Sequence, residues 1–453
     1  MQDVQAKGAG ARSSWSSRIG FILAAAGSAV GLGAIWKFPY MAGTNGGSVF
    51  FLPYIVFTLT IGLALLVGEM CMGRAARGGA ATAFRKLGGA KWAPVGFICV
   101  LTGAGVLAFY SVVGGWCVHY LLEAVLGRGV AEDPATMRAT FETFAGNGFE
   151  AVLCHVIFLT ATAAVVLLGV EKGIERVSKI LMPLLFVMML VLIVRGLMLP
   201  GAFEGLVFLF RPDPEAFTGE ALLNALGFSF FSLSVGSGSM MNYGSYLPDR
   251  VNVGSSTAWI VCLAILSAVL GGLMIMPAVF AFGLSPDAGP GLTFATMPAV
   301  FAKLPLGGLF AVIFYTCLFV AAITSSISIL EMTTQHCVDV YGMTRRRAAF
   351  LVSTVLGVLG IFCALSFGPL ADVKLFGKTI FDLFDYATSN IGMPIGCLGI
   401  AGVAGWTAWR TTRSELLRNA RWSPAALKAM RFILGVVSPI VILIVAAKGL
   451  GLL

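Results

Sequence analysis

The sequence predicts an all-α polytopic membrane protein with about eleven transmembrane helices. Of its 453 residues, 58% are hydrophobic and only 11% are charged, which is more apolar surface than a soluble protein of this size can bury. Apolar runs of about 20 residues, the length that crosses a bilayer, recur along the whole chain. The predicted spans are residues 18–41, 48–72, 94–126, 150–170, 176–199, 218–246, 254–284, 307–340, 347–367, 380–408 and 430–451.

The basic residues predict how these spans are oriented. Most of the 30 lysines and arginines fall on one side of the spans, for example in Arg345–Arg347 and between Arg410 and Arg431. Cytoplasmic loops of helical membrane proteins carry this excess, so the N-terminus is predicted to be cytoplasmic and the C-terminus outside. The net charge of +9 therefore reflects topology and contact with a lipid bilayer, and we expect no nucleic acid as partner.

A repeated glycine-rich stretch divides the chain into two halves. The run "SAVGLG" (28–33) in the first span resembles "LSVGSG" (233–238) in the sixth. Because glycine in a helix interior costs about 1 kcal/mol relative to alanine, the two runs predict broken helices. Five spans lie in each half, so the second half is inverted, as in secondary transporters built from inverted repeats. The alternative is that the glycines only allow close packing of unbroken helices.

This division predicts four segments. They are a cytoplasmic N-terminal segment (1–17), a first repeat (18–199), a second repeat (218–408) and an eleventh span (430–451).

Longer motifs accompany the two breaks along nearly the whole chain. They are "WSSRIGFILAAAGSAVGLG" (15–33), "NGGSVFFLPY" (45–54), "GEMCMGR" (68–74), "FYSVVGGW" (109–116), "GIERVSKILMP" (173–183), "FFSLSVGSG" (230–238), "PAVFAFG" (277–283), "AAITSSISILE" (321–331) and "FDLFDYATSN" (381–390). In this order they resemble the neurotransmitter:sodium symporter family, particularly its eleven-span bacterial amino-acid transporters. The resemblance implies a five-plus-five inverted-repeat fold and Na⁺-coupled symport of an amino acid or close analogue by alternating access, not an enzyme.

The eighth span places two hydroxyls, Thr324 and Ser325, next to each other in an apolar helix. Hard cations bind several oxygen ligands, which hydroxyls and unwound carbonyls supply. The resemblance implies that this is the second sodium site of the family. Its ligands are the carbonyls of Gly27, Val30 and Ala321 and the hydroxyls of Thr324 and Ser325. The alternative is that the hydroxyls only bond to carbonyls of their own helix.

The first sodium site of the family is altered in this sequence. Its side-chain ligands fall at Ala34, Ser232 and Leu263, and alanine and leucine cannot ligate a cation. We therefore expect coupling to one Na⁺, through the second site alone. Chloride is also doubtful, because Phe228 stands where the family usually has glutamine. The remaining residues of the chloride-binding pattern are Tyr54, Ser232 and Ser267.

By the same resemblance, the substrate is expected between the two breaks. The backbone amides of Leu32 and Gly33 with the Tyr110 hydroxyl are expected to hold a carboxylate, and glycine at position 31 suits a substrate that carries one. The predicted substrate-binding residues are Ser28, Ala29, Gly31, Leu32, Gly33, Val106, Tyr110, Phe231, Ser232, Ser234, Ser237, Ser325, Ser328 and Ile329. Ser237 replaces a bulkier residue of the leucine-type members, which predicts a roomier and more polar pocket.

Ionisable residues inside spans are costly and usually paired, and here they match the gates of the family. Lys37 and Asp385 match the outer pair, and Arg12 and Asp339 match the inner pair. The supporting inner residues are Trp15 and Tyr246, and Glu69 is expected to accept backbone N–H groups at the second break. The alternatives are a topological anchor for Arg12 and snorkelling to the interface for Lys37 and Asp385.

Two other functions remain open from the sequence. One is a proton-coupled or uncoupled amino-acid or amine transporter of the same fold, and the other is a substrate-binding membrane sensor. We expect a multi-pass protein of the bacterial cytoplasmic (inner) membrane. It would take a small-molecule substrate and exist as a monomer or weak dimer.

Overall fold

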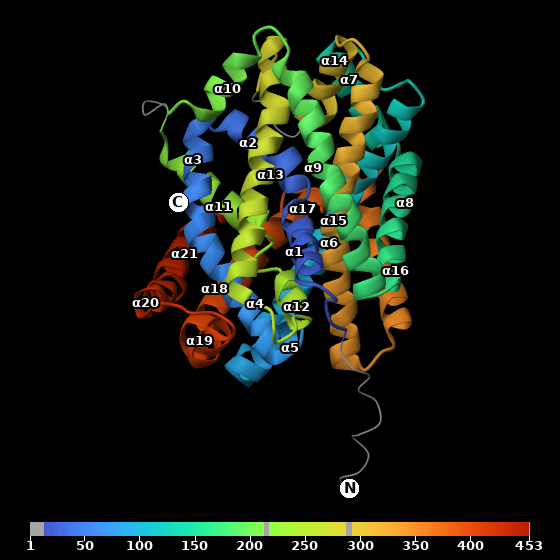
Figure 1. Ribbon diagram of the computed structural model, residues 1–453. Helices are drawn as coiled ribbons and strands as arrows, with labels where there is room; N and C mark the ends of the chain where they lie inside the picture. Colours follow the sequence, from blue (N-terminus) through green and yellow to red (C-terminus); the bar gives the residue numbers. More distant parts are fainter. Residues whose placement is uncertain (1–12, 213–216, 287–291, 453) are drawn as a thin grey trace.

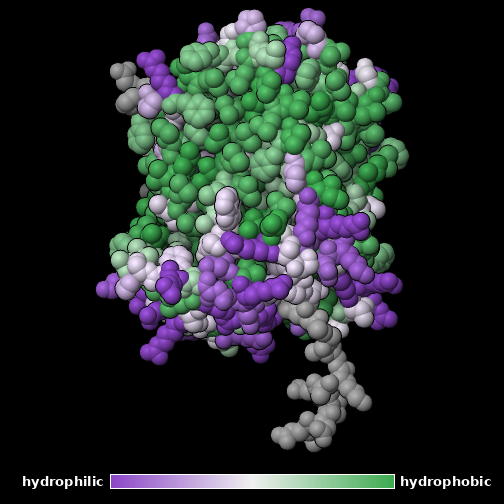
Figure 2. Space-filling view, in the orientation of Figure 1, coloured by the Kyte–Doolittle hydropathy of each residue, from purple (hydrophilic) through white to green (hydrophobic). Residues whose placement is uncertain are grey.

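The computed structural model describes residues 13–212, 217–286 and 292–452. Its long helices run roughly along one axis (Figure 1). Figure 2 shows that hydrophobic residues cover most of the visible face, while hydrophilic residues gather at the end where the chain begins. This distribution suits a protein whose middle contacts lipid and whose ends contact water.

The helices of the first half follow the predicted apolar runs. They are α1 (Arg18–Ala29), α2 (Phe38–Thr44), α3 (Ser48–Phe57), α4 (Leu63–Ala76), α5 (Ala80–Ala83), α6 (Ala93–Val125), α7 (Pro134–Gly146), α8 (Gly148–Leu167), α9 (Arg176–Leu197) and α10 (Ala202–Phe210). Short helical segments of other types join several of them. They are the π-helices η1 (Gly33–Lys37), η2 (Thr58–Gly62), η3 (Phe84–Gly88) and η5 (Val170–Glu175) and the 3₁₀ helix η4 (Ala90–Trp92).

The second half repeats this organisation. Its helices are α11 (Gly219–Ser232), α12 (Ser239–Ser245), α13 (Val253–Ala281), α14 (Met297–Ala302), α15 (Gly307–Tyr341), α16 (Arg345–Leu365), α17 (Ile380–Tyr386), α18 (Met393–Gly402), α19 (Trp409–Leu417), α20 (Pro424–Phe432) and α21 (Ser438–Gly449). The π-helices here are η6 (Leu292–Thr296), η7 (Ala387–Gly392), η8 (Val403–Thr407) and η9 (Ile433–Val437).

The described residues contain 9 helical segments long and apolar enough to cross a membrane, or 10 when the bent pair Arg18–Ala29 and Gly33–Thr44 is one span. The sixth predicted span consists of α11 and α12, with 14 and 7 residues, each too short to cross alone. The all-helical membrane fold is confirmed, whereas the count of eleven stays a prediction.

Both glycine-rich runs interrupt helices. After α1 ends at Ala29, the chain bends by 45° before it continues to Thr44. Between α11 and α12, Ser234 has φ +54°, and Gly236 and Gly238 have φ +86° and +84°. These are left-handed backbone values, which glycine adopts without strain. Gly236 and Gly238 therefore explain why the helix is interrupted between α11 and α12.

The two breaks lie inside the helix bundle, against the long helices α6 and α15, which pack on each other. Figure 1 places α5, α12 and α19 at the end where the chain begins and α7, α10 and α14 at the opposite end. Following the predicted topology, we call these the inner end and the outer end.

Candidate functional site

The hydroxyls of α15 face the break at the end of α1. The Ser325 hydroxyl donates to the carbonyl oxygens of Gly27 and Ser28, each 3.1 Å away. The neighbouring Thr324 hydroxyl donates to the carbonyl of Ala321 at 3.1 Å, within its own helix. A methyl group on Gly27 would lie 3.1 Å from the Thr324 Cβ, so the two helices approach closely here. The bonds of Ser325 therefore link two helices, while those of Thr324 stay within one.

This donor set suits a small hard cation. The fifth predicted ligand, Val30, follows the last residue of α1 and is fully buried. The hydroxyls of Thr324 and Ser325 give their protons to carbonyls, so their oxygen lone pairs stay available. Hydroxyl and carbonyl oxygens are the ligands that hard cations prefer. The residues present thus fit Na⁺ at the α1 break.

A small cavity lies between the two breaks. Its volume is about 40 Å³. The residues that line it are Ser28, Ala29, Gly31, Gly33, Val106, Tyr110, Phe231, Ser232, Ser234, Ser237, Ser325, Ile329 and Met393. All of them except Met393 belong to the predicted substrate-binding set. Met393 begins α18 and is 7% exposed, and a methionine among apolar neighbours gives no chemical signal in the sequence.

The two predicted residues that do not line the cavity lie directly behind it. The Leu32 backbone N–H donates to the Tyr110 hydroxyl at 3.3 Å. The hydroxyls of Ser28 and Ser328 are 2.6 Å apart and share a hydrogen bond. The Ser234 hydroxyl, from the second break, donates to the Ser28 carbonyl at 3.1 Å. The first and second breaks are thus joined by side-chain hydrogen bonds around one cavity.

Close contacts explain two glycines of the first break. A methyl group on Gly31 would lie 2.1 Å from the Ser325 Oγ and 3.0 Å from the Tyr110 hydroxyl. A methyl group on Gly33 would lie 3.1 Å from the Phe231 ring. The backbone therefore comes as near to these side chains as it can without a side chain of its own.

The region of the first sodium site is apolar. Ala34 is buried, and a methyl group on Gly271 of α13 would lie 2.2 Å from its carbonyl oxygen. Leu263, on the same helix, packs partly buried against the core. The Ser267 hydroxyl donates to the Ala264 carbonyl at 2.8 Å. Two of the three expected ligands therefore offer no side-chain oxygen, and the residues do not fit a second Na⁺.

Aromatic rings fill the neighbouring chloride region. The Phe228 ring centroid lies 5.9 Å from that of Phe38, 5.7 Å from that of Phe50 and 5.1 Å from that of Tyr54. The Tyr54 hydroxyl donates to the Ser232 hydroxyl at 3.3 Å. Position 228 is therefore surrounded by aromatic rings, and the phenylalanine there offers no side-chain N–H to an anion.

A larger cavity of about 730 Å³ lies on the outer side of Tyr110 and Phe231. Both Lys37 and Asp385 line it. The Lys37 ammonium lies 4.1 Å from the centroid of the Phe231 ring, and Asp385 accepts a hydrogen bond from the Ser389 hydroxyl at 2.9 Å. Although the two predicted gate residues face the same cavity, no ion pair joins them in the described part of the chain.

The inner side of the site is covered by Trp15, which is 2% exposed. Its indole N–H donates to the Tyr243 carbonyl at 3.0 Å, and its backbone N–H donates to the Tyr246 carbonyl at 3.3 Å. The Tyr246 hydroxyl in turn donates to the carboxylate of Glu331 at 2.7 Å. Glu331 is fully buried and forms an ion pair with Arg345. We did not predict Glu331, although a glutamate inside an apolar span is itself a signal of a buried partner.

Two further predicted inner residues make backbone contacts, and one cannot be placed. Arg12 lies outside the described residues. Asp339 accepts from the Gly79 N–H at 3.3 Å. Glu69 is buried in α4 and accepts the backbone N–H groups of Gly236 at 3.2 Å and Met241 at 3.1 Å. It thereby caps backbone groups that the break in the sixth span leaves without helical partners.

Comparisons with known proteins identify the family to which the chain is similar. The model of the Sodium:neurotransmitter symporter family matches residues 12–128 and 140–451. A sodium-dependent transporter of Bacillus subtilis (strain 168) is 41% identical over 444 residues, 97% of this chain and 98% of the relative. A sodium-dependent transporter of Haemophilus influenzae is 34% identical over 417 residues, 89% of this chain and 91% of the relative.

Among solved structures, MhsT in complex with L-phenylalanine superposes with a TM-score of 0.89 at 38% identity, over 97% of this chain and 100% of that one. The family motifs, the two broken helices and these similarities lead to one conclusion: this chain belongs to the sodium:neurotransmitter symporter family and is a sodium-dependent symporter.

Proposed function

We propose that this symporter couples transport of a neutral amino acid, or a close analogue, to a single Na⁺ by alternating access. The observation that carries the proposal is the link between α15 and the α1 break, where the Ser325 hydroxyl reaches two α1 carbonyls at 3.1 Å. A cation held by both helices favours the conformation in which they are together. A ligand shifts such an equilibrium only by its differential affinity for the two states.

The apolar first site supports coupling to one ion. Ala34 and Leu263 offer no side-chain oxygen, and burying a cation without ligands is strongly unfavourable. Each charge that moves inward releases about 2.3 kcal/mol per 100 mV of membrane potential. A one-ion symporter with a neutral substrate therefore gains half the electrical driving force of a two-ion symporter. The aromatic packing around Phe228 supports a chloride-independent cycle.

The cavity supports a neutral substrate. The residues that line it include five serines and no charged side chain. The Tyr110 hydroxyl and the nearby Leu32 N–H are placed to bind a carboxylate, and MhsT has been solved with an amino acid, L-phenylalanine. A volume of about 40 Å³ holds little more than a water molecule, so the cavity must widen when a substrate enters. We place the protein in the bacterial inner membrane, as a monomer or weak dimer.

The test is a thermal-shift screen of the purified full-length protein. Amino acids, amines and β-amino acids are compared in NaCl, KCl and sodium gluconate. We expect stabilisation by amino acids only when Na⁺ is present, equally with chloride or gluconate, and a sodium titration with a Hill coefficient of one. Stabilisation in KCl would favour a proton-coupled or uncoupled transporter. A clearly cooperative sodium titration would contradict the single site.

A matched pair of variants locates the ion. Thr324→Val removes a hydroxyl at the α1 break with little change in shape, and Thr333→Val removes a hydroxyl that bonds to its own helix, donating to the Ile329 carbonyl at 3.0 Å. We expect only the first variant to lose stabilisation by sodium. Uptake into proteoliposomes then separates a transporter from a sensor, because a sensor binds its ligand without moving it.

A further inference from the structure

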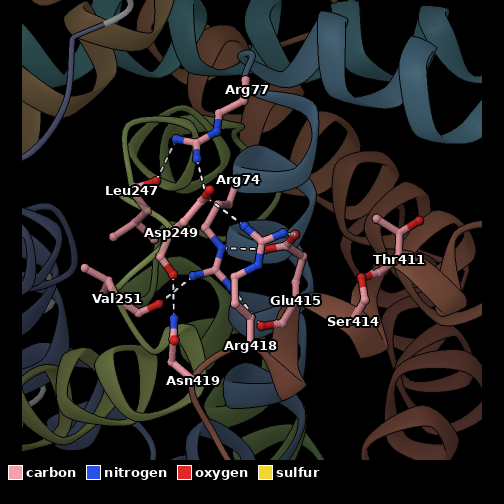
Figure 3. A network of polar contacts seen from close by, with 10 residues as sticks. All are labelled: Arg74, Arg77, Leu247, Asp249, Val251, Thr411, Ser414, Glu415, Arg418 and Asn419. Carbon is pink, nitrogen blue, oxygen red and sulfur yellow. Dashed lines mark hydrogen bonds and ion pairs between the residues drawn. The ribbon is translucent and has the colours of Figure 1, made fainter.

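The loop between α12 and α13 is held at three alternate backbone carbonyls by side chains of other elements (Figure 3). The Arg77 guanidinium donates to the Leu247 carbonyl at 2.8 Å. The Asn419 amide donates to the Asp249 carbonyl at 2.5 Å, and the Arg74 guanidinium donates to the Val251 carbonyl at 2.5 Å. This loop of seven residues (246–252) is therefore held along its length.

Ion pairs connect the same loop to α4 and to the end of α19. Arg74, whose side chain is fully buried, pairs with Glu415 of α19 at 2.5 Å. Arg418 lies 2.7 Å from the Asp249 carboxylate and 3.3 Å from that of Glu415. Arg77 also pairs with Asp249. Figure 3 shows these five side chains converging between the ribbons, so we call them, with Asn419, the inner clamp.

The helix before the loop is tied equally closely to α4. A methyl group on Gly73 would lie 1.9 Å from the Met241 carbonyl, and one on Gly244 would lie 2.7 Å from the Met70 carbonyl. The backbones of α4 and α12 are thus in direct contact, and Glu69 accepts hydrogen bonds from Gly236 in the second break and from Met241 in α12. As a result, α4, α12 and the loop form one connected body.

On its other side, α12 contacts the segment before α1 through Trp15, and α15 through the hydrogen bond from Tyr246 to Glu331. The inner path must open along that seam, because the α4 side is locked by backbone contact. We propose that the inner clamp makes α19 move together with α4, α12 and the loop between α12 and α13 when the inner path opens. Its residues Arg74, Glu415, Arg418 and Asn419 are then positioning residues for the inner gate. They act through the loop that sets the end of α12, and they do not touch the substrate cavity.

The buried pair gives this arrangement its rigidity. Removing one partner of a buried ion pair leaves an uncompensated charge and is strongly destabilising, so the clamp resists partial release. Net positive charge remains, since three arginines face two carboxylates. The proposal rests on alternating access but on neither the substrate nor the number of sodium ions.

The experiment is hydrogen–deuterium exchange on the full-length protein in nanodiscs, in KCl and in NaCl. The variants are Glu415→Gln, which keeps the shape of a buried side chain, and Asn419→Gly. Asn419 is exposed and has a left-handed backbone with φ +61°, which glycine adopts without strain. The control is Arg413→Gln, which removes an exposed charge from the same helix outside the clamp. Peptides covering 246–253 and 409–421 report on the clamp, and a peptide covering 26–33 reports on the sodium site.

In KCl, we expect Asn419→Gly to raise exchange at 246–253 by about fivefold, the factor of one ordinary hydrogen bond, and Glu415→Gln to raise it further. Arg413→Gln should leave it unchanged. In wild type, sodium should change exchange at 246–253 and 409–421 in the same direction, and in Glu415→Gln the response at 409–421 should be lost.

Three outcomes would overturn the proposal. In the first, exchange at 246–253 in the clamp variants equals that in Arg413→Gln. In the second, sodium changes the exchange of the wild type at only one of the segments 246–253 and 409–421. In the third, sodium changes exchange at 26–33 but at neither of those two segments. Loss of the sodium response at 26–33 itself would count against the proposed sodium site instead, and the comparison of variants in KCl would still decide the clamp.

Discussion

Replacing Gly31 by alanine should weaken sodium binding, although Gly31 is not itself a predicted sodium ligand. The added methyl group would lie 2.1 Å from the Ser325 Oγ, a distance at which one atom must move. The Tyr110 hydroxyl, 3.0 Å from the same methyl, restricts movement of the backbone. The Ser325 side chain therefore has to rotate away from the carbonyls of Gly27 and Ser28.

The size of the effect follows from the bonds that Ser325 gives up. It donates to two carbonyls at 3.1 Å each, and a typical hydrogen bond contributes about 0.5–1.5 kcal/mol. Losing the ordered hydroxyl should cost about 1–3 kcal/mol, which raises the sodium concentration for half-saturation by about 5- to 150-fold. Gly227→Ala in α11 is the control, since its methyl group would lie 3.6 Å from Val445 in ordinary contact.

The assay is a sodium titration of the melting temperature in the absence of amino acids. Because Ser325→Ala removes the atom that the methyl group strikes, the double variant Gly31→Ala/Ser325→Ala should be no worse than Ser325→Ala alone. Such non-additivity is the signature of two changes acting through one group. The reasoning fails if Gly31→Ala binds sodium within twofold of wild type, or if the two changes add.

Three further predictions concern other parts of the chain. Ala34→Asn combined with Leu263→Asn restores oxygen ligands at the first site, so the Hill coefficient for sodium should rise from one towards two; no change would mean that other residues close that site. Met393→Ala removes part of the cavity wall, which should move the thermal-shift preference towards larger amino acids at a stability cost of about 2–5 kcal/mol, and an unchanged preference would place the substrate elsewhere. The Thr136 hydroxyl helps to hold the pKa of Asp133 below its ordinary value. Asp133 therefore stabilises the start of α7 above its ordinary pKa. Protection of the first α7 amides from hydrogen exchange, relative to their intrinsic rate at each pH, should be lost as the pH falls through the lowered pKa, a dependence that Asp133→Ala should abolish.

The sequence predicted the parts of the fold in which a local residue pattern is also required by the membrane environment. Apolar runs had to become helices because no other structure satisfies the backbone in lipid. Glycine-rich runs in such helices had either to interrupt the helix or to pack closely. The first run does both, because α1 ends at Ala29 and Gly31 packs closely against Ser325. The short helix α7 gave no comparable signal, since polar residues interrupt its apolar positions, and α10, with 9 residues, is too short to be recognised as a span.

The residues that were missed depend on contacts between distant segments. Met393 reaches the cavity only because α18 packs on the second break, where a methyl group on Gly236 would lie 2.5 Å from the Met393 carbonyl. Arg74 and Arg77 belong to the excess of basic residues on one side of the spans, which is sufficient to explain their side of the membrane. Their pairing with acidic residues of α19 and the loop could not be predicted, because this rule counts basic residues and specifies no partner for them.

The inner clamp also has a consequence for how the protein is made. Arg74 and Glu415 are separated by 341 residues, which a ribosome needs about 17–70 s to add at about 5–20 residues per second. During that time the α4 arginine can help to orient early spans in the membrane while its partner does not yet exist. The ion pair can close only after the tenth predicted span has been synthesised, so it forms late in biogenesis. A chain truncated before α19 would leave Arg74 without Glu415, so the inner end of an unfinished chain would be less stable than that of the complete one.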